Sequence, residues 1–156
     1  ARRALARAAE VDGALRGAQA VVSPVQVGGT VYYRVLVDPA ASQSEVEALR
    51  GSAAAVLGVR DPSGWIPRRT PMGFLVDRFE SLADAQARAA TLRERGIWAY
   101  VREVEGGGPA FAVYVGAYEG TSDAATLARQ LRSAGLGDAR FVRRVGRVPA
   151  EPPRNR

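Results

Sequence analysis

Aromatic and arginine side chains alternate along two apolar segments of the sequence. Trp98, Tyr100 and Arg102 fall two residues apart in segment 97–105, and Tyr114 lies in segment 111–118. A period of two places such residues on one face of a β-strand. An aromatic ring offers its face to the C–H groups of a sugar ring and its polar group to the hydroxyls, while a guanidinium pairs with carboxylates. The pattern therefore predicts a surface that binds a ring-shaped ligand.

The composition excludes several catalytic chemistries. The chain has no Cys, no His and no Lys, and all 22 basic residues are Arg. It can therefore form no Ser-His-Asp or Cys-His nucleophile, no usual zinc or iron–sulfur site and no lysine Schiff base. Asp77 with Glu103 or Glu105 is the best carboxylate pair, but this spacing favours solvated charges over an acid–base pair. We expect a non-enzyme without metal or cofactor.

Composition predicts a globular chain, since 47% of the residues are hydrophobic and 24% are charged. A chain of 156 residues suffices for one domain or two modules of about 75 residues. The 16 acidic residues leave a net charge of +6, and segment 147–156, rich in proline, is expected to be a disordered tail that carries part of it. The remaining charge mildly favours an acidic ligand. No apolar run approaches 18 residues, so we expect neither a membrane span nor a signal peptide in this chain.

The second half predicts a βαββαβ unit. Ser81 is the expected N-cap of the first helix, Gly96 ends that helix, and Thr121 or Ser122 is the expected N-cap of the second helix, which Gly135 ends. Glycines 106–108 lack the strand-to-helix setting of a phosphate loop and predict a hairpin turn. The elements are expected as strand 73–76, helix 82–95, strand 97–105, strand 111–118, a helix ending at 134 and strand 140–145, in the sheet order 4-1-3-2.

The first half repeats part of this pattern. Segments 33–40 and 44–49 match 111–118 and 122–127 at a constant offset of 78 residues, which predicts duplicated modules. Residues 2–17 predict a helix, 20–27 a strand and Gly28-Gly29 a turn, but no segment matches the first strand. Either an upstream segment supplies it or the module closes in another way. Residues 65–66 predict an edge strand. The expected boundaries are a module at 1–66, a linker at 67–72, a module at 73–146 and the tail at 147–156.

The second half also carries the motifs of a known family. Residues 79–81 (Phe-Glu-Ser) enter an Ala-rich helix ending at 92–96 (Leu-Arg-Glu-Arg-Gly), and residues 113–118 (Val-Tyr-Val-Gly-Ala-Tyr) enter one ending at 131–135 (Leu-Arg-Ser-Ala-Gly). Residues 73–145 thus resemble the SPOR domain, the sporulation-related repeat of bacterial cell-division and envelope proteins. The resemblance implies an RNP-like βαββαβ unit that binds peptide-stripped peptidoglycan glycan strands in the periplasm or cell envelope. It extends more weakly over the first half.

The sequence departs from the family pattern at several strand positions. Leu75, Asp77 and Arg78 stand where the family usually has Gln, Gly and Ser, and Ala112 stands where Arg is frequent. In the first half Asp38 replaces the Gly of the pattern and Ala40 replaces its aromatic residue. These two departures make the first module the weaker candidate for glycan binding.

Two helices are expected to cover one face of each antiparallel sheet and to leave the other face open. In the second module this open face predicts a glycan platform, in which Arg102, Arg143 or Arg144 pairs with the lactyl carboxylates on alternate sugars. The predicted glycan-binding residues are Leu75, Trp98, Tyr100, Arg102, Ala112, Tyr114, Arg143 and Arg144.

Two alternatives remain open from the sequence. Open-faced βαββαβ sheets also stack RNA bases, but residues 110–115 do not match the RNP1 pattern of RNA-binding domains, so no nucleic-acid partner is expected. In the other alternative the first module covers the open face of the second, and the chain is a structural or protein-interaction module. Other cell-division or envelope proteins are candidate partners beside the glycan strands.

Overall fold

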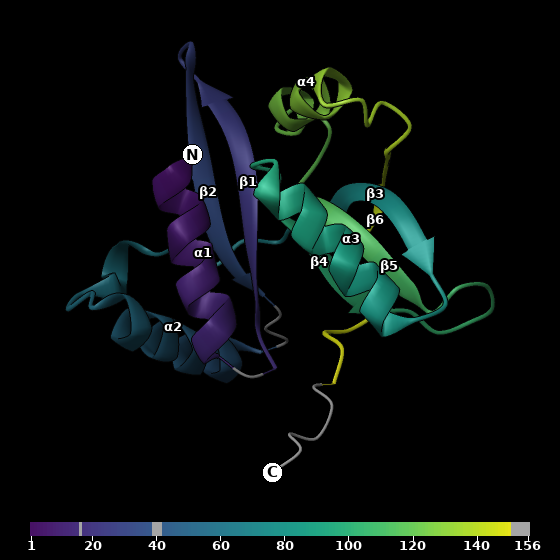
Figure 1. The fold of residues 1–156 in the computed structure, drawn as a ribbon. Coiled ribbons are helices and arrows are strands. Elements are labelled where there is room, and N and C mark those ends of the chain that lie inside the picture. Colours follow the sequence, from purple (N-terminus) through teal and green to yellow (C-terminus); the bar gives the residue numbers. More distant parts are fainter. Residues whose placement is uncertain (16, 39–41, 151–156) are drawn as a thin grey trace.

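The computed structural model describes residues 1–15, 17–38 and 42–150, and this part of the chain forms two antiparallel sheets with four α-helices (Figure 1). The predicted α+β class is confirmed. None of the described helices is long and apolar enough to cross a membrane. In chain order the elements are α1 (Arg2–Ala14), β1 (Gln19–Val27), β2 (Thr30–Asp38), α2 (Gln43–Leu57), a 3-10 turn (Pro62–Gly64), β3 (Met72–Phe79), α3 (Leu82–Glu94), β4 (Ala99–Glu103), β5 (Phe111–Tyr118), α4 (Ala125–Ser133) and β6 (Arg140–Arg143).

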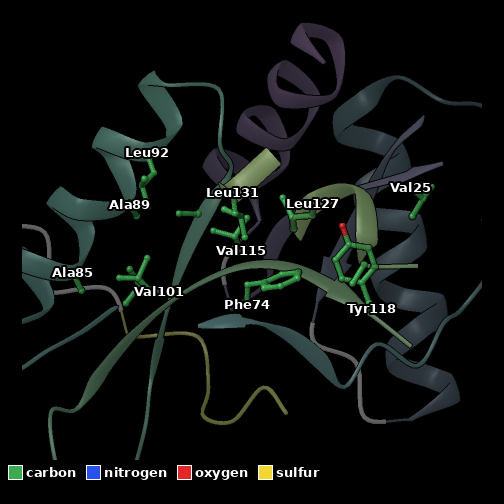
Figure 2. Close-up of a cluster of buried hydrophobic side chains, with 13 residues drawn as sticks. Val25, Phe74, Ala85, Ala89, Leu92, Val101, Val115, Tyr118, Leu127 and Leu131 are labelled. Atoms are coloured by element: carbon green, nitrogen blue, oxygen red, sulfur yellow. The ribbon is translucent and has the colours of Figure 1, made fainter. Parts of the chain in front are cut away.

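The second half forms a four-stranded sheet in the order β4-β5-β3-β6, and every neighbouring pair is antiparallel. Numbered within the unit, this is the predicted order 4-1-3-2. Helices α3 and α4 lie on one face, where small and branched side chains interlock with the strands (Figure 2). The buried residues of this core include Phe74, Ala85, Ala89, Leu92, Val101, Val113, Val115, Tyr118, Leu127 and Leu131.

A local capping signal marks the start of α3 in this half, but not the start of α4. The Ser81 hydroxyl accepts a hydrogen bond from the backbone N–H of Asp84 at 3.1 Å, which confirms the predicted N-cap. The prediction of Thr121 or Ser122 as the second cap is wrong. The Ala124 N–H bonds to the Thr121 carbonyl in a turn, so α4 begins only at Ala125 and has no side-chain cap.

The first half contains the β1–β2 hairpin, which turns at Gly28 and Gly29, and the helices α1 and α2. Both glycines have positive φ, +56° and +82°, as a tight hairpin turn requires. The predicted edge strand at 65–66 is wrong: these residues belong to no strand and directly follow the 3-10 turn. Asp61 starts that turn by accepting a hydrogen bond from the Ser63 N–H. Residues 39–40, predicted to end the second strand, lie outside the described residues.

The predicted tail is in part attached to the second sheet. Backbone N–H and C=O groups of Arg147 and Glu103 bond to each other at 2.8 and 3.0 Å. Residues 151–156 of that tail lie outside the described residues.

Candidate functional site

The strand face is the side of the second sheet opposite α3 and α4, and the strand register gathers predicted site residues there. Tyr100 lies opposite Tyr114, and Arg102 lies opposite Ala112. Leu75 flanks Tyr114 from β3. The two tyrosine rings stack with centroids 6.0 Å apart and an interplanar angle of 26°. Alternation along β4 and β5 thus brings five of the predicted residues together.

The strand face is covered rather than open in this structure. Val21 of β1 is fully buried among Tyr100, Ala112 and Tyr114, and the two tyrosines are 0% and 2% exposed. β1 is buried over seven consecutive residues because its two faces pack on α1 and on the second sheet (Figure 1). The expectation of an open face is therefore wrong for this conformation, while glycan binding by these residues stays a prediction.

Directional hydrogen bonds fix β1 on the second sheet. The Ser23 hydroxyl accepts from the N–H of Ala117 at 2.9 Å and donates to its carbonyl at 3.0 Å. The Tyr118 hydroxyl donates to the Pro24 carbonyl at 2.8 Å. All these groups are buried, so separating β1 from the sheet would cost each of them its partner until water replaced it.

Trp98 belongs to the contact between the two halves. Its Nε1 donates to the Ala20 carbonyl at 2.8 Å, and its ring packs beside Val11 and Val22. The guanidinium of Arg93 lies 3.7 Å from the ring centroid, a cation–π geometry. Trp98 is therefore displaced from the stacked tyrosines and faces α1 and β1.

Two arginines of the predicted site meet a carboxylate from the first half. Asp38, at the end of β2, accepts from Arg102 and, at 3.2 Å, from Arg144. The three side chains are only 18%, 8% and 6% exposed. Arg144 also donates to the Tyr100 hydroxyl at 3.2 Å. Nothing in the sequence marks Asp38 except its departure from the family pattern. Its carboxylate nevertheless lies where a ligand carboxylate would pair with these arginines.

Few polar groups of the site are free to pair with a ligand in this conformation. Among the residues that the structure describes, the buried Nε of Arg102 has no hydrogen-bond partner. Arg143, at the end of β6, is exposed. A carboxylate ligand could thus approach Arg143 directly, whereas it reaches the other two arginines only by replacing Asp38.

Burial makes the hydroxyl of Tyr100 a weaker acid than that of an exposed tyrosine. Desolvation raises the pKa of Tyr100 to about 12, and the nearby charges of Arg144 and Arg102 oppose that rise. Since the phenol ionises near pH 10 in the unfolded chain, its contribution to stability is complete below pH 10 and is lost as the pH rises toward 12.

The stability of the wild-type protein is expected to fall by about 2–3 kcal/mol more than that of Tyr100→Phe between pH 9 and pH 12, since each pKa unit corresponds to about 1.4 kcal/mol. Denaturant melts of both proteins across this range measure the difference. Burial also raises the pKa of Tyr118, and Tyr118 is common to both proteins. Parallel stability profiles would show that Tyr100 is not buried as described.

Comparison with known proteins identifies one segment. Residues 76–143, from the middle of β3 to the end of β6, match the family model of the SPOR domain. No curated protein and no solved structure matches the chain. The SPOR domain is a peptidoglycan-binding module of envelope-associated proteins, so the match supports a binding role for the second half rather than a catalytic one.

Proposed function

We propose that this chain is a non-catalytic module that binds peptide-stripped glycan strands of peptidoglycan and localises its parent protein in the bacterial envelope, at division sites. The observation that carries the proposal is that the segment matching the SPOR domain brings two stacked tyrosines and an arginine onto one sheet face. It includes six of the eight predicted site residues, and Leu75 and Arg144 adjoin its ends.

The chemistry of the strand face suits such a ligand. Tyr100 and Tyr114 offer ring faces for the C–H patches of pyranoses together with hydroxyls for their rims. Arg102 and Arg144 are spaced to share one carboxylate, as they do with Asp38, and lactyl carboxylates occur on alternate sugars of the stripped strand. Binding here requires β1 to separate from the sheet, so the glycan must bind the separated form more tightly.

We extend the proposal to the first half, as a shortened copy of the second. The order α1-β1-β2-α2 corresponds to α3-β4-β5-α4. At the offset of 78, Leu36 on β2 faces the contact between the halves as Tyr114 does, and Val35 faces helix α1 as Val113 faces α3 and α4. Corresponding residues of β2 and β5 thus point to corresponding sides of their sheets. This agreement supports a common origin of the β1–β2 and β4–β5 hairpins.

A second candidate function has its own support. The hydrogen bonds of Ser23 and Tyr118 and the pairing of Asp38 tie the halves into one packed body. In a structural or protein-interaction module the strand face would stay closed permanently, and the chain would bind no glycan.

Retention of the protein on purified sacculi, before and after an amidase removes the stem peptides, tests the leading proposal. We expect retention to rise on the stripped material, with no release of soluble fragments. Excess single-stranded RNA should not displace the protein. Equal retention on intact and stripped sacculi would contradict recognition of the bare glycan, and absence of retention on both would favour the structural module.

A further inference from the structure

The outer edge of β2 has no strand beside it among the described residues. All nine residues of β2 pair with β1 on one side, from Thr30 with Val27 to Asp38 with Gln19. Strand β5, its counterpart in the second half, pairs with β4 on one side and with β3 on the other. The unpaired N–H and C=O groups of such an edge are a template for a further strand.

A groove of about 1270 Å³ runs along this free edge. Helices α1 and α2 and strand β2 form part of its wall, and residues 64–71 line it as well. Strand β6, which flanks β3 in the second half, corresponds at the offset of 78 to residues 62–65, which overlap the start of this lining segment. The groove thus lies where β3 lies in the second half, between the hairpin and the segment after the second helix.

The apolar lining of the groove resembles a core from which the side chains of one strand are missing. Leu49 of α2 corresponds to Leu127 of α4 at the same offset; Leu127 is 3% exposed, whereas Leu49 is only partly buried and lines the groove. In the second half Phe74 of β3 shares the buried core with Leu127, and Val76 packs against it. Among the described residues of the first half, no strand beside β2 supplies such side chains to cover Leu49.

The charged side chains that line the groove are almost all positive. Arg3, Arg7, Arg50 and Arg69 are among its lining residues, and Asp38 is the sole carboxylate in the lining as described. Asp38 is already paired with two arginines. An occupant with acidic side chains beside its apolar ones would complement this lining.

We propose that this groove receives a β-strand from the segment that precedes Ala1 in a longer polypeptide. The strand pairs antiparallel with β2, buries alternate apolar side chains against α1 and α2, and carries acidic residues toward the arginines. Ala1 itself lines the groove, and β3 joins α3 through only Glu80 and Ser81, so an equally short connection suffices. The inference rests on the proposed correspondence of the halves and not on glycan binding.

A fusion tests this inference with the chain's own strand as the probe. A copy of residues 72–80 is placed directly before Ala1, and the matched control carries the same copy with Asp in place of its Phe74 and Val76. The readouts are hydrogen exchange of the β2 backbone, thermal melting and native mass. For the first fusion we expect the β2 N–H groups that point away from β1 to exchange at least about tenfold more slowly, a Tm several degrees above that of the control, and a monomer.

Each other outcome counts against the proposal. Equal exchange in the two fusions would show that the groove does not accept a strand. Protection that depends on protein concentration would assign the edge to a second copy of the chain. Protection of the same N–H groups in the unfused chain by soluble stripped glycan, without protection in the fusion, would make the groove a ligand site instead.

Discussion

Replacement of Tyr100 by Ala is expected to lower the free energy of unfolding by about 3–5 kcal/mol, the usual cost of deleting a buried aromatic side chain. Tyr100 is fully buried, stacks on Tyr114 and donates a hydrogen bond to the Gly116 carbonyl at 2.8 Å. In a chain of this size the loss lowers Tm by about 10 °C. Differential scanning calorimetry measures it.

Tyr32→Ala is the matched control for this prediction. Tyr32 also lies on a strand but is 54% exposed, so its removal should change Tm little. Similar small effects of the two substitutions would mean that Tyr100 is exposed in solution and that β1 does not cover the strand face.

Asp38→Asn is expected to cost about 3 kcal/mol, because it leaves two largely buried guanidinium groups without their shared countercharge. Chemical denaturation of the variant and the wild type measures the loss. The difference should persist at high salt, since the pair is shielded from solvent.

Glu105→Gln provides the control for Asp38. Glu105 pairs with Arg147 at 2.8 Å, but both side chains are largely exposed, so no measurable loss is expected. If Asp38→Asn were equally neutral, Asp38 would not hold Arg102 and Arg144, and the two arginines would be available to a ligand without any movement of the first half.

The second unit was predictable because its signals are local. Alternation along 111–118 assigns Val113 and Val115 to the helix side and Tyr114 to the strand face, and Ser81 marks a helix start through its own hydroxyl. The start of α4 was missed because a turn from Thr121 to Ala124 precedes the helix, and several nearby residues offer equally good cap chemistry.

The covering of the strand face was not predictable in the same way. Contacts such as Ser23 with Ala117 join residues 94 positions apart, and no local periodicity encodes which surface a strand covers. One signal was present: Ala20, Val21 and Val22 are consecutive apolar residues, and such runs indicate a strand buried on both faces. Only one face of β1 can meet α1, so the other needed a partner.

Because the natural chain has no Cys, a single engineered disulfide can hold β1 on the second sheet. The side chain of Ser23 contacts the backbone of Ala117 directly, so the double variant Ser23→Cys/Ala117→Cys is designed to link β1 to the second sheet on oxidation. Ser23→Cys alone, treated with the same oxidant and reductant, controls for both reagents. Thermal melts establish that every form is folded.

Retention of this double variant on peptide-stripped sacculi is the most direct test of glycan binding at the strand face. The reduced form should be retained, and the oxidised form should lose about tenfold or more of that retention, since a glycan that needs the separated form cannot bind the locked one. Equal retention of the oxidised and reduced forms would contradict binding at the strand face.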